Sequence, residues 1–229
     1  MELETYWTLT KRPLLSLWFI LPPLLAYHLG ALFLPAPMGL RANYDLLRFL
    51  RYFGAASAVL PPLLVLFVLG VGAYVRRDRF EFRPRVLGVM VVESLVWAGP
   101  LMILGHFNAA DRVLHGGREL LASALQSVGA GVYEEFLFRM VFLTAFTAFF
   151  VDLLKWRRDA FVTAGVVIGA VLFALYHFLP GGNTFNWGSF IFLTAAGLLW
   201  GLAYMTRGFG IAVGSHIAWD IYCVIRMAG

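Results

Sequence analysis

Seven apolar segments divide this chain, and each approaches or exceeds the roughly 20 residues that a helix needs to cross a bilayer core. They lie at residues 14–35, 54–75, 85–105, 120–154, 160–179, 188–205 and 208–226. Composition agrees, because 61% of the residues are hydrophobic and only 14% are charged, whereas soluble domains carry about 25% charged residues. The sequence therefore predicts an all-α fold, a polytopic membrane helix bundle with about seven transmembrane helices.

The fourth apolar segment, at 120–154, is too long for one ordinary transmembrane helix. Gly129 and Gly131 are expected to break it. An amphipathic lead-in would then precede a helix that starts near Val132. A further span in this region would raise the number of transmembrane helices to eight, and the sequence leaves that alternative open.

Lys and Arg residues between the apolar segments predict the topology, because cytoplasmic loops collect these residues. One set of alternating loops is the richer and contains Lys11, Arg12, Arg76, Arg77, Arg79, Arg83, Arg85, Lys155, Arg157, Arg158 and Arg207. With seven helices, this places the N-terminus in the cytoplasm. The loop at 180–187 has no Lys or Arg and is expected on the opposite side. The net charge of +5 belongs largely to these loops and does not indicate a nucleic-acid partner.

Three ionisable side chains lie close together inside the fourth apolar segment: Glu134, Glu135 and Arg139. A charge at membrane depth costs at least ~2.5–3.5 kcal/mol, so such residues are functional candidates. On a helix, Glu135 and Arg139 are four residues apart and can form an ion pair on one face. Glu134 is rotated by about 100° from Glu135. We therefore expect one glutamate to be held by the arginine and the other to remain free to act.

Further polar side chains occur in later apolar segments at helical spacing. Phe173 and His177 are four residues apart near the end of one segment, and His216 and Asp220 are four apart in the last. Because unpaired polar groups are costly in lipid, residues on different helices are expected to converge with the glutamates. Glu93, in the third segment, is expected instead to pair with a polar neighbour.

Three short patterns thus follow one another along the chain: Glu134-Glu135-x-x-x-Arg139, Phe173-x-x-x-His177 and His216-x-x-x-Asp220. In this order they resemble the motifs of the CPBP (Abi) family of intramembrane proteases. That family includes the type II CAAX prenyl endopeptidases and bacterial bacteriocin-processing and self-immunity proteins. The resemblance implies one membrane domain over residues 1–229, in which 1–118 supply helices without motifs and 119–229 form the catalytic core.

The resemblance also implies glutamic protease chemistry without a metal or another cofactor. By motif position, Glu134 corresponds to the catalytic glutamate and is paired with His177 to activate a water. Burial makes a carboxylate a more capable base, and a neighbouring imidazole can orient the water or share its proton. Glu135, Arg139 and Phe173 take supporting positions in the same motifs.

His216 and Asp220 would stabilise the oxyanion of the tetrahedral intermediate. The family pattern permits Asn or Asp at the second of these positions. An ionised Asp cannot donate a hydrogen bond, so Asp220 either is protonated or accepts from His216. We expect the second arrangement, in which Asp220 fixes the tautomer of His216 and leaves the imidazole as the donor.

Other functions compatible with these residues are a zinc-dependent membrane protease that uses His177, His216 and a carboxylate as ligands, and a non-catalytic bacteriocin-immunity or scaffold protein. The zinc alternative lacks the H-E-x-x-H helix. A proton-coupled carrier would require internal repeats that the sequence does not show. We therefore expect an intramembrane endopeptidase that cuts a protein or peptide near the membrane surface, such as a C-terminal tail or a secreted-peptide precursor. Its partners would be this substrate and membrane lipid, in a bacterial inner membrane; the oligomeric state stays open.

Overall fold

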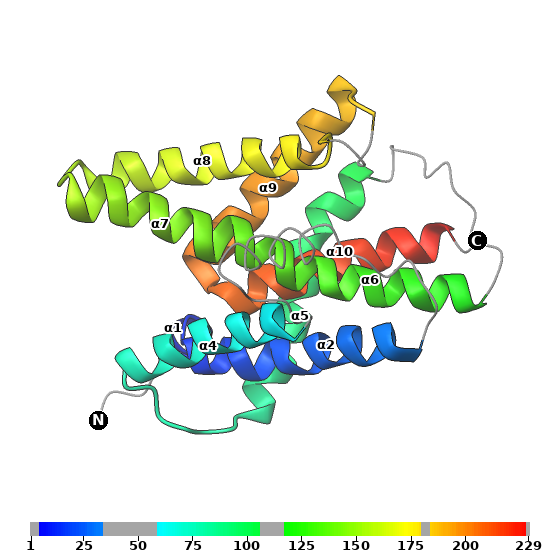
Figure 1. Ribbon diagram of the computed structural model, residues 1–229, viewed down its shortest axis with the longest axis horizontal. Helices are drawn as coiled ribbons and strands as arrows, with labels where there is room; N and C mark the ends of the chain where they lie inside the picture. Colours follow the sequence, from blue (N-terminus) through cyan, green and yellow to red (C-terminus); the bar gives the residue numbers. More distant parts are fainter. Residues whose placement is uncertain (1–4, 34–58, 106–116, 180–183, 228–229) are drawn as a thin grey trace.

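The computed structural model describes residues 5–33, 59–105, 117–179 and 184–227, and every regular element within these ranges is a helix (Figure 1). The elements are α1 Tyr6–Leu9, α2 Pro13–Phe33, α4 Leu60–Val75, α5 Pro84–Gly105, α6 Gly117–Glu135, η1 Phe136–Leu143, α7 Thr144–Thr147, η2 Ala148–Leu153, α8 Arg158–Tyr176, α9 Trp187–Arg207 and α10 Phe209–Met227. The predicted all-α membrane bundle is confirmed.

Among the described residues, five helices are long and apolar enough to cross a membrane: Pro13–Phe33, Pro84–Gly105, Gly117–Leu153, Arg158–Tyr176 and Trp187–Arg207. The other two predicted segments also form helices. One is α4, which is shorter at 16 residues, and the other is α10, which has 19 residues and carries several polar side chains. Parts of the predicted segments and loops, at residues 34–35, 54–58 and 180–183, lie outside the described residues.

The predicted break at Gly129 and Gly131 is wrong, because the helix runs without interruption from Gly117 to Leu153. Both glycines are buried within α6. A Cβ atom on Gly131 would lie only 2.5 Å from the Ile217 Cγ1 atom and 3.1 Å from the Ile217 backbone nitrogen on α10. Gly131 therefore allows two helices to approach closely, and neither glycine interrupts the helix. After Glu135 the backbone hydrogen bonds widen to the π-helical pattern of η1, which often marks functional sites.

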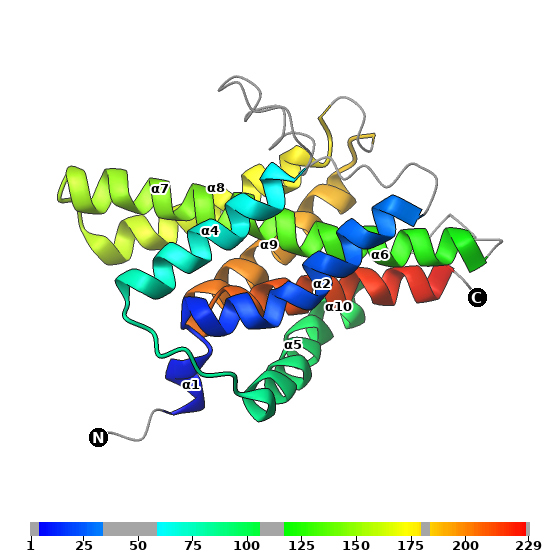
Figure 2. The same cartoon turned by 60° about the horizontal axis from the view of Figure 1, so that its bottom comes forward.

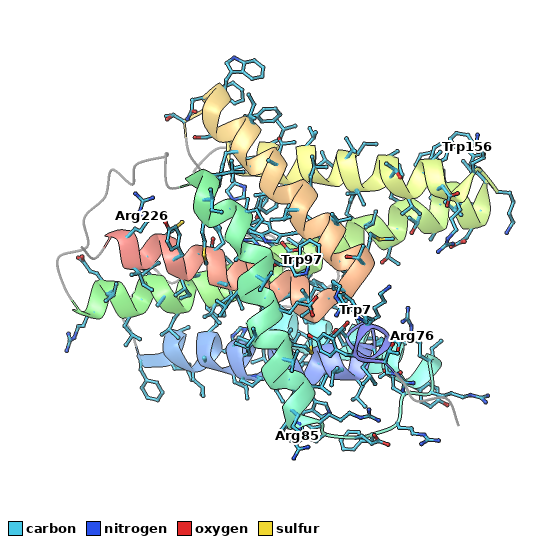
Figure 3. The ribbon with its side chains drawn as sticks, turned by 180° about the vertical axis from the view of Figure 1, so that it is seen from behind. Trp7, Arg76, Arg85, Trp97, Trp156 and Arg226 are labelled. Atoms are coloured by element: carbon cyan, nitrogen blue, oxygen red, sulfur yellow. The ribbon has the colours of Figure 1, made fainter. Side chains whose placement is uncertain are left out.

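The long helix and α10 lie at the centre of the bundle. Figures 1 and 2 show α6 and α10 side by side, with α2 and α4 along one flank. On the other flank α8 runs alongside α7 (Figure 1) and also contacts α9. Figure 3 shows α5 crossing the bundle steeply over α10. One apolar core lies where α2, α4, α6 and α10 meet, and it includes Leu24, Tyr27, Leu69, Tyr133 and Val213.

A polar cluster around Glu93 on α5 joins the N-terminal residues to the end of α9. The Glu93 carboxylate accepts two hydrogen bonds from Arg207, one to each oxygen. Its Oε2 atom also accepts a hydrogen bond from the hydroxyl of Tyr6 at 2.5 Å. Burial raises the pKa of the Tyr6 hydroxyl well above its usual value, so Tyr6 stays a donor. The expectation that Glu93 pairs with polar neighbours is confirmed.

Immediately after Arg207, the turn into α10 passes through Gly208 with φ 96°. This left-handed conformation favours glycine. A Cβ atom at this position would also lie 2.6 Å from the carbonyl oxygen of Thr10. The turn that starts α10 is therefore packed directly against the N-terminal residues, and this packing sets where α10 begins.

Candidate active site

Glu135 and Arg139 form a buried ion pair where α6 continues into η1, as the sequence predicts. Arg139 Nε lies 3.1 Å from Glu135 Oε2, and both side chains are almost completely buried. The guanidinium also donates to the carbonyl oxygen of Gly197 on α9 at 3.0 Å. It lies over the ring of Phe173 on α8, 4.8 Å from the ring centre. Because a buried charge is stable only when it is paired, Arg139 fixes Glu135 between the helices that surround it.

The second oxygen of Glu135 fixes the orientation of His216 on α10. His216 Nδ1 lies 2.9 Å from Glu135 Oε1. Since a carboxylate accepts hydrogen bonds, the hydrogen-bond network assigns the proton to Nδ1. His216 Nε2 then lies 3.8 Å from Glu134 Oε2 and 3.6 Å from Asp220 Oδ2. The expectation that Asp220 fixes this tautomer is wrong. Glu135 makes the hydrogen bond that fixes it, and Asp220 lies beyond hydrogen-bond range of His216.

His177 follows the last turn of α8 and is oriented by the same helix. Its Nδ1 atom lies 2.9 Å from the carbonyl oxygen of Phe173, so this nitrogen is the donor. The imidazole also packs edge-on against the Phe173 ring, with the centroids 4.7 Å apart. The four-residue spacing therefore gives Phe173 two ways to hold His177. The Nε2 atom of His177 is left facing Glu134.

Glu134 is the point on which both histidines converge. Its Oε2 atom lies 3.8 Å from His177 Nε2 and 3.8 Å from His216 Nε2. These separations are too long for direct hydrogen bonds but short enough for a single water to bridge two of these atoms. The fold therefore brings all four predicted catalytic residues together from α6, α8 and α10.

The site is open on one side and closed on the other. The side chains of His177 and Asp220 are each 24% exposed, and that of Glu134 is 11% exposed. Glu135 and His216 are buried, with side-chain exposures of 0% and 3%. A solute can therefore reach the free face of Glu134, while the residues that orient the site are shielded from it.

Trp200 on α9 belongs to the site, although its sequence context indicates only a belt or packing residue. Its indole is stacked on the His216 imidazole, with ring centroids 3.8 Å apart and an angle of 9° between the planes. A signal was present in the sequence, because Trp200 lies between Gly197 and Gly201. A Cβ atom on Gly197 would lie 2.8 Å from Ala170 Cα on α8. A tryptophan beside such small residues points into a helix interface and away from lipid.

The arrangement of the site residues also bears on the zinc alternative. Within residues 5–33, 59–105, 117–179 and 184–227, no group of three or more His, Cys, Asp or Glu side chains has an arrangement that could hold a metal ion. Each histidine of the site has its Nδ1 atom engaged in a hydrogen bond, and its Nε2 atom lies 3.8 Å from Glu134 Oε2. The chemistry open to the two Nε2 atoms is therefore set by the side chains that lie opposite them, above all Glu134.

Comparison with known proteins shows that this part of the chain is similar to one family. Residues 116–222, slightly less than half of the chain, match the family model for the type II CAAX prenyl endopeptidase Rce1-like proteins. No curated protein and no solved structure matched the chain. The matched range contains Glu134, His177, His216 and Asp220. This match relates the integral membrane protein to the type II CAAX prenyl endopeptidases and to the CPBP (Abi) membrane proteases.

Proposed function

We propose that this protein is an intramembrane glutamic endopeptidase in which Glu134 activates a water. The observation that carries the proposal is the convergence of two histidines on one carboxylate. His177 Nε2 and His216 Nε2 each lie 3.8 Å from the same oxygen of Glu134. Both Nδ1 atoms are engaged as donors elsewhere, so in the neutral histidines the two Nε2 atoms are acceptors.

A water beside Glu134 meets two acceptors, the Glu134 carboxylate and the Nε2 atom of His177. It can satisfy them only by donating its hydrogens, which leaves its oxygen lone pairs free to attack. Glu134 is the general base, and it takes a proton as the water oxygen bonds to the scissile carbonyl carbon. His177 orients the water and can share the proton, because its Nε2 atom lies opposite the same carboxylate oxygen.

The tetrahedral intermediate then collapses with the proton returned to the substrate. As the carbon–nitrogen bond breaks, the proton held by Glu134 passes to the leaving nitrogen, and the Glu134 carboxylate is regenerated. With a proton on Nε2, His216 would donate to the developing oxyanion. Glu135 holds the imidazole by its other nitrogen. Asp220, at 3.6 Å from the same Nε2 atom, would receive or return that proton between cycles.

The partly exposed face of the site suits an extended peptide that approaches from one side of the bilayer. We propose a membrane-bound protein or peptide as the substrate, cut near the membrane surface, for example at a C-terminal tail or within a secreted-peptide precursor. A bacterial inner membrane is the proposed location. The Rce1-like match supports peptidase activity in general, and the Glu134 geometry supports the glutamic mechanism.

The test is a cleavage assay with the purified protein reconstituted in lipid vesicles. Peptides with an apolar tail of graded length would be incubated with wild type and with Glu134→Gln, and new termini would be identified by mass spectrometry. We expect products from wild type alone, and we expect them to persist in the presence of a chelator. Loss of cleavage with chelator and its recovery with added zinc would assign the reaction to a zinc protease. Equal cleavage by Glu134→Gln would overturn the proposed base.

A further inference from the structure

Trp200 is positioned to control the orientation of His216. Its side chain comes from α9, outside the three helices that carry the predicted catalytic residues, and it is only 1% exposed. It lies parallel to the imidazole at 3.8 Å. Phe173 meets both rings edge-on, with centroids 5.6 Å from Trp200 and 5.9 Å from His216. Together, Trp200 and Phe173 enclose one face and one edge of the imidazole.

Apolar volume alone does not account for a tryptophan at this position. The indole Nε1 atom is buried and has no hydrogen-bond partner within the part of the chain that the structure describes. A buried donor without a partner is destabilising, and an aliphatic side chain such as leucine would fill space without that cost. The feature that tryptophan adds is a large flat face. That face favours an imidazole in either protonation state, since aromatic stacking and cation–π attraction both act across it.

The hydrogen bond from His216 Nδ1 to Glu135 does not by itself fix the imidazole plane. The second side-chain torsion of histidine is broad, so the ring can tilt about this contact. A tilt would move Nε2 away from Glu134 and Asp220, which lie 3.8 Å and 3.6 Å from it. A stacked face prevents this motion.

We propose that Trp200 is a positioning residue for the reaction: its indole holds the His216 ring in the plane that aims Nε2 at Glu134 and at the substrate oxyanion. The proposal rests on the proposed protease function for its kinetic consequence. Its structural consequence, the fixed ring of His216, does not depend on that function.

The kinetic test compares Trp200→Leu with Trp200→Phe. Phenylalanine keeps an aromatic face and removes the unpartnered N–H, so its kcat should stay within about 3-fold of wild type, because the ring stays in place. Leucine lacks a flat face, and we expect kcat to fall about 10- to 100-fold with little change in KM, as for a misplaced catalytic group. Equal losses in both variants, or none in Trp200→Leu, would contradict the positioning role.

A measurement without substrate separates this proposal from the proposed function. Nitrogen NMR of ¹⁵N-histidine-labelled protein reports which imidazole nitrogen carries a proton, and His216→Gln would assign the signal. We expect wild type and Trp200→Phe to show a proton on Nδ1 alone, and Trp200→Leu to show a mixture of tautomers. If Trp200→Leu does not fold, Trp200→Met takes its place. An unchanged His216 signal would refute the positioning role, whereas inactive wild type with the expected signals would refute only the protease function.

Discussion

Glu134 and Glu135 are adjacent in sequence, yet the structure gives them opposite surroundings. Glu134 is partly exposed and makes no direct ion pair at hydrogen-bond distance with either histidine, whereas Glu135 is fully buried against Arg139. Replacing Glu134 with glutamine preserves its size and removes only the base. We expect cleavage to fall by at least ~10²-fold, while the melting temperature in detergent stays near that of wild type. A folded Glu134→Gln protein with wild-type turnover would rule out this base.

The matched change at the neighbouring residue should act on stability. Glu135→Gln leaves the Arg139 guanidinium as an uncompensated buried charge, a loss that typically costs ~3–5 kcal/mol. It also replaces the carboxylate that accepts from His216 Nδ1. We therefore expect a clear fall in melting temperature together with lost activity. Wild-type stability in Glu135→Gln would mean that the ion pair does not support the fold.

These two residues also show what a sequence can predict at this scale. The Glu135–Arg139 pair follows from four-residue spacing on a single helix. The bond from Glu135 to His216 depends on how α6 and α10 are rotated against each other, which no spacing within one segment reports. For the same reason, Asp220 is the expected partner of His216 from sequence, since it lies four residues away on the same helix. The Trp200 stack is likewise a contact between helices.

At the scale of the helices, the close approach of α6 and α10 depends on Gly131. An alanine Cβ at this position would lie 3.1 Å from the Ile217 backbone nitrogen and 3.2 Å from the Val213 carbonyl oxygen. Neither backbone atom can move without displacing α10 and, with it, His216. We expect Gly131→Ala to lower stability by about 1–3 kcal/mol, the usual cost of overpacking, and to reduce cleavage.

Gly88→Ala is the matched control for this prediction. Gly88 is also helical, in α5, and a Cβ atom there would meet nothing within 4 Å. Alanine is favoured over glycine in a helix by roughly 0.5–1 kcal/mol, so this variant should be as stable as wild type or more so. Thermal unfolding in detergent compares the two. A Gly131→Ala protein as stable as Gly88→Ala would show that α10 can move apart at little cost.

Apolar length predicted the helices of this bundle, but it did not predict the continuity of residues 117–153. Glycines such as Gly129 and Gly131 weaken an isolated helix, so a local analysis treats them as breaks. In the folded chain the missing side chain of Gly131 lets α10 pack against α6, and the helix continues without a break. The signal for continuity therefore lies in the partner helix, which is distant in the sequence.

In the whole molecule, the basic segments gather at one end. Arg76 donates to the Lys11 carbonyl oxygen at 3.3 Å, and Arg12 lies 3.7 Å from Asp78. Arg207 lies against the Trp7 ring. Figure 3 shows Arg76 and Trp156 toward this end of the molecule, and Arg226 toward the opposite end. By the preference of Lys and Arg for the cytoplasmic side, we propose that this end faces the cytoplasm.

This orientation predicts where the site opens. The helix α8 begins at Arg158, at the basic end, and its 19 residues span about 28 Å, so His177 lies near the opposite membrane surface. Glu134 is within 3.8 Å of it. We expect single cysteines in a Cys223→Ala background to react with a membrane-impermeant thiol reagent in intact cells at Thr184, seven residues after His177 in the sequence, and not at Asp159. Both should react after the cells are permeabilised, which controls for accessibility. Labelling at Asp159→Cys alone would show that the cavity faces the cytoplasm, so the substrate would be cut on that side.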